Sequence, residues 1–162
     1  MYIQDSSNTT LRQVLFFRNF AESGAAAMMT TFNSILYATD CIFESNVCGS
    51  KGGAIGTESR SRAIFRNSVL RDNRANSGGA LYVTDFTNPR LYNCTFTNNT
   101  ATSKGGAIYI SNRASLDISN SHFDSNVAHN GLGGAILVLD FSFVNLDFSS
   151  FTVRELARRG KS

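Results

Sequence analysis

Small or apolar residues alternate with polar residues in short stretches that recur along the chain. The stretches align when Phe16, Phe43, Leu70, Phe96, Phe123 and Phe151 are treated as equivalent. Five residues before these positions stand Leu11, Ala38, Phe65, Leu91, Ile118 and Leu146. Two residues before them stand Val14, Cys41, Ser68, Cys94, Ser121 and Ser149. The residue directly before this second column is polar in the first five repeats: Gln13, Asp40, Asn67, Asn93 and Asn120. A period of two predicts β-strands with these columns on the inner face.

A second strand is predicted after each of four Gly-Gly-Ala-aliphatic sequences. Its inner columns are Ile55, Leu81, Ile108 and Ile136, followed by Thr57, Val83, Ile110 and Val138. Gly56, Tyr82, Tyr109 and Leu137 lie between them and are expected to point outward. The structural glycines are Gly52, Gly53, Gly78, Gly79, Gly105, Gly106, Gly133 and Gly134. Each pair is expected to provide a positive φ or a close approach between coils.

These motifs recur at one period. The glycine motifs begin 26, 27 and 28 residues apart, and a Phe-x-x-Asn or Leu-x-x-Asn sequence precedes each of them. We therefore predict an all-β repeat protein, a right-handed parallel β-helix of about five to six coils with roughly 27 residues and two or three strands per coil. Two columns are predicted to form structural ladders at the turns: Asn19, Asn46, Asn73, Asn99 and Asn126, and Asp40, Asn67, Asn93 and Asn120.

The expected domain organisation is one β-helix over residues 1–151 and a basic tail over residues 152–162. Thr152 to Glu155 has the pattern of a capping box, and Gly160 suits a helix C-cap. A short capping helix over residues 153–159 is therefore expected, and the alternative is a tail left by truncation.

The charge of the chain is concentrated in its tail. The net charge of +3 equals the contribution of residues 152–162, where four basic residues face Glu155, so the rest is near neutral and a nucleic-acid partner is not expected. No membrane-spanning segment or signal peptide is visible in the sequence. Cys41, Cys48 and Cys94 occupy small positions of the pattern and are expected to be buried.

The coupled Gly-Gly-Ala-Ile and Phe-x-x-Asn sequences over residues 16–136 resemble the repeats of the chlamydial polymorphic outer-membrane protein family. This resemblance implies an autotransporter-like passenger, exposed at the cell surface or secreted, that mediates adhesion. The chain departs from that pattern because it shows neither a signal peptide nor a barrel. The expected role is that of a binding or adhesion scaffold, and the chain is expected to be a segment or relative of a larger passenger. The expected localisation is outside the cell or on its surface.

No catalytic, cofactor-binding or metal site is expected. The chain has no Asp-Asp pair, and its glycine pairs lack the aspartates of calcium-binding β-helix repeats. Asp85 and Asp140 share one column, two coils apart, which suits either catalysis or a simple strand exit. His122 and His129 are expected to be ordinary surface residues. The alternative function is a carbohydrate-active β-helix, a lyase or hydrolase, with catalytic residues that the sequence does not identify.

A binding surface is the favoured functional feature. Tyr82, Tyr109 and Leu137 form an outward column that suits stacking on sugar rings or anchoring a protein, and the alternative is packing that stiffens the sheet. The expected partner is a host-surface protein or glycan, and the chain is expected to be a monomer or part of a longer chain. Leu15, Ile42 and Val69 form a further outward apolar column. A third option is an ice-binding surface formed by Thr30, Thr57 and Thr84, but these threonines align only loosely from one repeat to the next.

Overall fold

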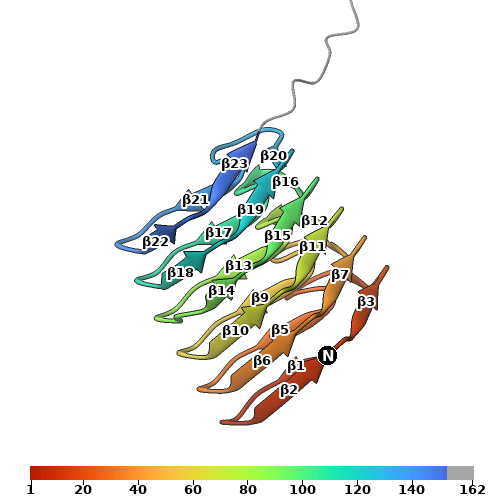
Figure 1. Ribbon diagram of the computed structural model, residues 1–162, viewed down its shortest axis with the longest axis vertical. Coiled ribbons are helices and arrows are strands. Elements are labelled where there is room, and N and C mark those ends of the chain that lie inside the picture. Colours follow the sequence, from red (N-terminus) through yellow and green to blue (C-terminus); the bar gives the residue numbers. More distant parts are fainter. Residues whose placement is uncertain (153–162) are drawn as a thin grey trace, which may run out of the picture.

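A computed structural model describes residues 1–152, which form one stack of parallel coils (Figure 1). The strands fall into three sheets of six and one of five, and every pair of neighbouring strands is parallel. Each strand pairs with the equivalent strand of the next coil. The fold class predicted from the sequence is thus confirmed as a parallel β-solenoid.

The four sheets, called A to D in the order in which the chain visits them, run the length of the stack. Sheet A contains β1 (Tyr2–Ile3), β5 (Met28–Thr30), β9 (Ile55–Thr57), β13 (Leu81–Val83), β17 (Ile108–Ile110) and β21 (Ile136–Val138). Sheet B contains β2 (Asn8–Arg12), β6 (Ile35–Thr39), β10 (Arg62–Arg66), β14 (Arg90–Tyr92), β18 (Ser115–Ser119) and β22 (Phe143–Asp147). Sheet C contains β3 (Leu15–Phe17), β7 (Ile42–Glu44), β11 (Val69–Arg71), β15 (Thr95–Thr97), β19 (His122–Asp124) and β23 (Ser150–Thr152). Sheet D contains β4 (Phe20–Ala21), β8 (Val47–Cys48), β12 (Arg74–Ser77), β16 (Thr100–Lys104) and β20 (Val127–Ala128).

Sheet D was not expected, because the sequence indicated only two or three strands per coil. Its shortest strands have two residues, which is too short for an alternating pattern to be recognised. A single residue with positive φ, such as Ser45, separates sheet C from sheet D. The chain therefore changes direction there without any glycine or proline to mark the turn.

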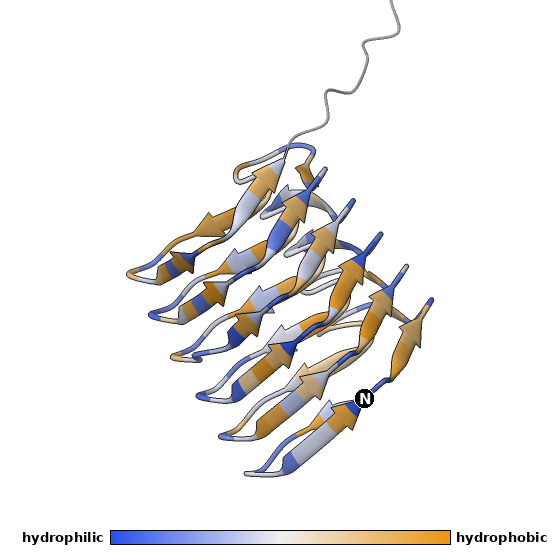
Figure 2. Ribbon diagram, viewed as in Figure 1, coloured by the Kyte–Doolittle hydropathy of each residue, from blue (hydrophilic) through white to orange (hydrophobic). Residues whose placement is uncertain are grey.

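The register of the sheets places equivalent residues directly over one another, as the sequence columns predicted. Phe65 pairs with Ala38 on one side and Leu91 on the other, and Phe96 pairs with Leu70 and Phe123. These inner side chains are fully buried in the middle coils and form one continuous hydrophobic core. The Phe96 and Phe123 rings stack with their centroids 4.7 Å apart. Figure 2 shows hydrophobic residues at the same places of successive coils.

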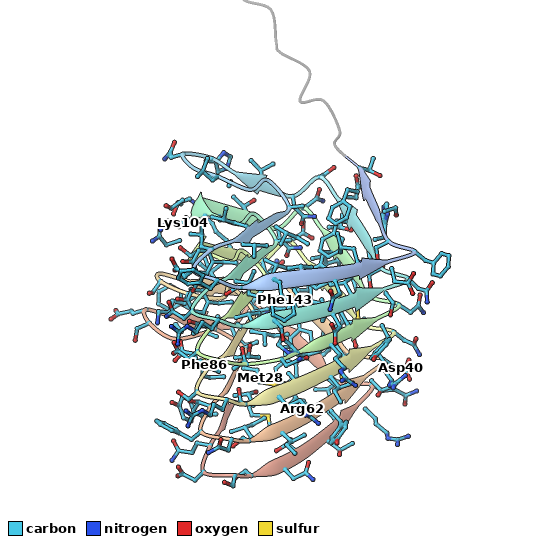
Figure 3. The ribbon with its side chains drawn as sticks, turned by 90° about the vertical axis from the view of Figure 1, so that its left-hand side faces the viewer. Met28, Asp40, Arg62, Phe86, Lys104 and Phe143 are labelled. Atoms are coloured by element: carbon cyan, nitrogen blue, oxygen red, sulfur yellow. The ribbon has the colours of Figure 1, made fainter. Side chains whose placement is uncertain are left out.

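The corners of the coils are made by residues with positive φ that are mostly not glycine. One such residue separates sheet B from sheet C in each coil: Gln13, Asp40, Asn67, Asn93, Asn120 and Phe148. Two consecutive such residues separate sheet A from sheet B, for example Asp85 and Phe86. Figure 3 shows that Phe86 and Asp40 lie at opposite edges of sheet B.

The expected capping helix over residues 153–159 lies outside the described residues. Thr152, expected in the tail, is the last residue of β23. Within residues 1–152, no helix is long and apolar enough to cross a membrane.

Candidate functional site

The inner asparagine ladder belongs to the structure rather than to the surface. Asn46, Asn73 and Asn99 are completely buried. The backbone N–H and the side-chain Nδ2 of Asn46 both donate to Oδ1 of Asn73, each at 3.0 Å. Nδ2 of Asn46 also donates to the carbonyl oxygen of Phe16 at 3.0 Å. Each asparagine side chain therefore satisfies a backbone N–H and a backbone carbonyl of the preceding coil, as Asn46 does for Asn19 and Phe16, which a hydrophobic side chain could not do.

The outer ladder is exposed and less regular. Nδ2 of Asn67 donates to Oδ1 of Asp40 at 3.2 Å, and Nδ2 of Asn93 donates to Oδ1 of Asn67 at 3.0 Å. Asn120 continues this column, and all four residues have φ near +50°. Asparagine and aspartate tolerate this conformation better than most residues, which explains their presence at this corner.

The two glycines of each motif have different roles. Gly78 has a φ of +65°, whereas Gly79 has an ordinary φ but touches the backbone of the next coil. A Cβ atom on Gly79 would overlap the carbonyl oxygen of Gly106 and lie 2.7 Å from the backbone nitrogen of Thr100. In the first three motifs, the first glycine thus has the positive φ and the second has the close approach, which the sequence left as alternatives. In the fourth motif Gly133 has a positive φ, but a Cβ atom on Gly134 would lie 3.5 Å from the nearest atom.

The outward column of sheet A is largely covered. Tyr82 stacks on Tyr109 with 5.0 Å between the ring centroids, and Tyr109 is only 8% exposed. Lys51 lies over the Tyr82 ring at 5.0 Å and forms an ion pair with Glu58, while Leu137 is half-buried beyond Tyr109. Burial raises the pKa of the Tyr82 phenol. Only Tyr82 and Leu137 therefore offer substantial surface to a partner at this place.

A more exposed set of side chains lies along the corner between sheets A and B. We call it the A–B edge, and it contains Phe32, Arg60, Phe86, Arg113 and Phe141, with Ser59, Asp85, Asn112 and Asp140 beside them. Phe32, Phe86 and Phe141 are 52%, 53% and 89% exposed. The guanidinium carbons of Arg60 and Arg113 lie 5.7 and 5.8 Å from the centroid of the Phe86 ring. The second turn position thus holds Arg60, Phe86, Arg113 and Phe141 on successive coils, whereas Phe32 occupies the first turn position of its coil, before Asn33.

Two hollows open to solvent along the A–B edge. The first has a volume of about 280 Å³ and is lined by Asp85, Phe86, Asn112, Arg113, Asp140 and Phe141. The second has a volume of about 380 Å³ and is lined by Phe32, Asn33, Ser59, Arg60, Asp85 and Phe86. They share Asp85 and Phe86, so together they follow the edge from Phe32 to Phe141.

Hydrogen bonds along the stack hold the turns of the A–B edge in register. The backbone N–H of Phe86 donates to the carbonyl oxygen of Asn112 at 3.2 Å, and that of Arg113 donates to the carbonyl oxygen of Asp140 at 2.9 Å. Nδ2 of Asn112 donates to Oδ1 of Asp85 at 3.0 Å. The spacing of the exposed side chains is therefore set by the backbone of the solenoid.

The sequence identified only part of this edge. Asp85 and Asp140 were placed correctly in one column, but the aromatic and arginine residues beside them were not recognised. A signal was present, because the dipeptide Asp-Phe occurs at residues 85–86 and again at 140–141, two coils later. In the intermediate coil the dipeptide is Asn112-Arg113.

The other candidate groups have structural surroundings. Cys41, Cys48 and Cys94 are buried and unpaired, as expected. Thr30, Thr57 and Thr84 are buried, which excludes them as an exposed ice-binding array. His122 hydrogen-bonds through Nδ1 to Oγ of Ser150 at 2.7 Å. In residues 1–152, no group of three or more His, Cys, Asp or Glu residues is arranged to hold a metal ion.

Comparison with known proteins supports the architecture. A protein-family profile described as "Right handed beta helix region" matches residues 2–155. Neither a curated protein nor a solved structure matches the chain. The match confirms the predicted handedness and covers nearly the whole chain.

Proposed function

Because this chain belongs to the right-handed β-helix family, we propose that it is a non-catalytic binding scaffold at the cell surface or in the extracellular space. The observation that carries the proposal is the A–B edge, where Phe86 and Phe141 project into solvent beside two hollows. Exposed aromatic side chains that border a concave surface are a typical feature of binding sites. The interior supports the same view, because its polar side chains are largely engaged in hydrogen bonds between coils.

The proposal extends to adhesion as part of a larger passenger. The repeated Gly-Gly-Ala-Ile and Phe-x-x-Asn sequences, which resemble those of chlamydial polymorphic outer-membrane proteins, support it. The solenoid also suits such a role, because its backbone presents the same side-chain positions at regular intervals along a rigid rod. The partner under this proposal is a protein or glycan on the surface of another cell.

The test is binding of the fluorescently labelled chain to intact cells. We expect saturable binding that is lost in the double variant Phe86→Asn/Phe141→Asn. Asparagine is well suited to the positive φ of +61° and +58° at these positions, so both substitutions preserve the turns. The control is Phe148→Asn, since Phe148 is 85% exposed with a φ of +44° but lies at the opposite corner of sheet B. Binding that is absent, or equally reduced by the control, would contradict the proposal.

A second candidate function is turnover of a polysaccharide, favoured by the presence of both Asp85 and Asp140 around one hollow. Two coils separate these residues by roughly 10 Å along the stack. This is slightly more than the separation of about 6.5–9.5 Å between the carboxyl groups of inverting glycosidases. Release of new reducing ends from polysaccharides, measured with and without Ca²⁺ and abolished by Asp140→Asn, would establish catalysis and overturn the non-catalytic proposal.

A further inference from the structure

We propose that the A–B edge binds a neutral, extended polysaccharide of β-1,4-linked hexopyranose units, aligned with the long axis of the solenoid. This inference rests on the proposed binding function and assigns its ligand class and its site. The central contacts are Phe86, Arg113 and Phe141, and Arg60 and Phe32 continue the site toward the N-terminal coils.

The spacing of the aromatic side chains is the first argument. Phe86 and Phe141 occupy the second turn position in coils that are two apart, and both have φ near +60°. Strands in a sheet are about 4.8 Å apart, so two coils advance by roughly 10 Å. The disaccharide repeat of an extended β-1,4-linked chain has a similar length, and every second sugar in such a ribbon presents the same face. Phe86 and Phe141 can therefore each contact one sugar, and the two sugars are two units apart and present the same face.

The polar groups at the edge suit sugar hydroxyls. Between the two rings lie the amide of Asn112 and the guanidinium of Arg113, and the carboxylates of Asp85 and Asp140 flank them. Planar carboxylate, amide and guanidinium groups bind pairs of neighbouring hydroxyls through two hydrogen bonds each. The aromatic side chains provide the matching apolar surface for the C–H faces of the sugars.

The charge balance favours a neutral ligand. Along the two hollows, the carboxylates of Asp85 and Asp140 are matched by the guanidinium groups of Arg60 and Arg113. An acidic polysaccharide would meet both carboxylates, and a cationic one would meet both arginines. A neutral chain of hydroxyl groups can bond to both kinds of group without a net repulsion.

The backbone provides an independent argument. Phe32, Phe86 and Phe141 combine an exposed aromatic side chain with a φ between +51° and +61°. A bulky residue is disfavoured in this conformation, where glycine or asparagine would cost less free energy. Exposure of the ring to water is unfavourable as well. Phe148 has the same two features at the opposite corner of sheet B, but there a single coil shows them. Their recurrence on alternate coils of the A–B edge is what is expected where a function retains such residues.

The experiment is isothermal titration of the purified chain with cello-, manno- and chito-oligosaccharides of increasing length. For at least one series we expect the affinity to rise steeply with length until the oligosaccharide spans both the Phe86 and the Phe141 ring. Longer oligosaccharides that also reach Phe32 are expected to show only a small further rise. The variants Phe86→Asn and Phe141→Asn are each expected to weaken binding about tenfold and to remove the steep rise with length. Phe148→Asn, the matched exposed phenylalanine outside the edge, is expected to bind as the unmodified chain does.

The outcomes separate this inference from the proposed function. Binding to cells that requires Phe86 and Phe141 but survives removal of surface glycans, with no affinity for any of the three oligosaccharide series, would overturn the ligand class and leave the scaffold function in place. Affinity that is independent of oligosaccharide length, or equal in all three variants, would also overturn the inference. Loss of cell binding together with loss of oligosaccharide binding in the same variants would support both.

Discussion

Asn99 occupies the position of Asn73 on the next coil, and Oδ1 of Asn99 accepts two hydrogen bonds from Asn73. The backbone nitrogen of Asn73 is 3.1 Å from this oxygen and Nδ2 is 3.0 Å from it. Both residues are fully buried. Because Nδ2 of Asn73 also donates to the carbonyl oxygen of Phe43 at 3.0 Å, one side chain connects three successive coils.

Asn73→Ala is expected to lower the free energy of unfolding by about 3 kcal/mol, because it leaves the buried N–H of Asn46 without its partner and removes the side-chain hydrogen bond to the carbonyl of Phe43. Urea denaturation followed by circular dichroism measures the change. The matched control is Asn76→Ala in the same coil, whose exposed side chain accepts only a hydrogen bond from Thr102, and it should cost within about 0.5 kcal/mol. Equal losses in the two variants would show that burial of the ladder is unimportant.

Gly79→Ala is expected to destabilise the chain by about 3 kcal/mol or more, because the added methyl group forces two coils apart. Gly24→Ala is the control for conformation alone. Gly24 has a φ of +80°, and no atom lies within 4 Å of the place that an added methyl group would take, so about 1 kcal/mol of backbone strain is expected. The denaturation midpoints of the two variants give the comparison. A midpoint for Gly79→Ala at or above that of Gly24→Ala would contradict the close-approach role.

Cys94 is expected to make the stability fall at alkaline pH. Burial raises the pKa of its thiol from 9.0 to about 11, so the unfolded chain loses this proton first. The raised pKa of Cys94 adds about 2–3 kcal/mol to the free energy of unfolding. This stabilisation is complete below pH 9 and is lost as the pH rises from about 9 to about 11. The free energy of unfolding, measured between pH 7 and pH 11 in parallel with Cys94→Ser, isolates this effect.

Cys94→Ser is a suitable reference because the same column contains serine. Sγ of Cys94 donates to the carbonyl oxygen of Tyr92 at 3.4 Å, just as Oγ of Ser68 donates to that of Arg66 at 2.8 Å. We expect the variant to fold with a change of less than about 1.5 kcal/mol at pH 7. If the two chains lose stability in parallel up to pH 11, the thiol is not responsible.

Tyr109→Ala is expected to cost about 3 kcal/mol, because the Tyr109 ring is almost completely buried, and Tyr82→Ala is expected to cost less. A double-mutant cycle should give a coupling energy of about 1 kcal/mol for the stacked pair. The same variants tested for cell binding separate packing from recognition. Unchanged stability with lost binding would make this column a contact surface, and an unchanged result in both assays would leave it without either role.

The sequence was sufficient for the parts of the fold that depend on alternation. Phe65, Leu91 and Ile118 follow a period of two within strands, so their inward direction and their stacking could be predicted, and the register confirms both. The A–B edge could not be found in this way. Phe86 and Arg113 lie in turns with two consecutive positive φ values, where the direction of a side chain no longer follows the strand period. The one indication in the sequence was that Asp-Phe, at residues 85–86, recurs two coils later at residues 140–141, while the coil between them has Asn112-Arg113.

The pairing of every coil with its neighbours through equivalent positions also bears on how such a chain evolves. The glycine motifs begin 26 to 28 residues apart, and the variation in length falls between the ladder asparagine and the glycine pair, where β12 and β16 absorb it by a shift of register. A tandem duplication of one such unit would insert a complete layer, with its own asparagine, ring and turn, between layers already shaped to receive it. Recombination can therefore change the length of the rod, and with it the number of exposed turn side chains along the A–B edge, while its cross-section stays constant.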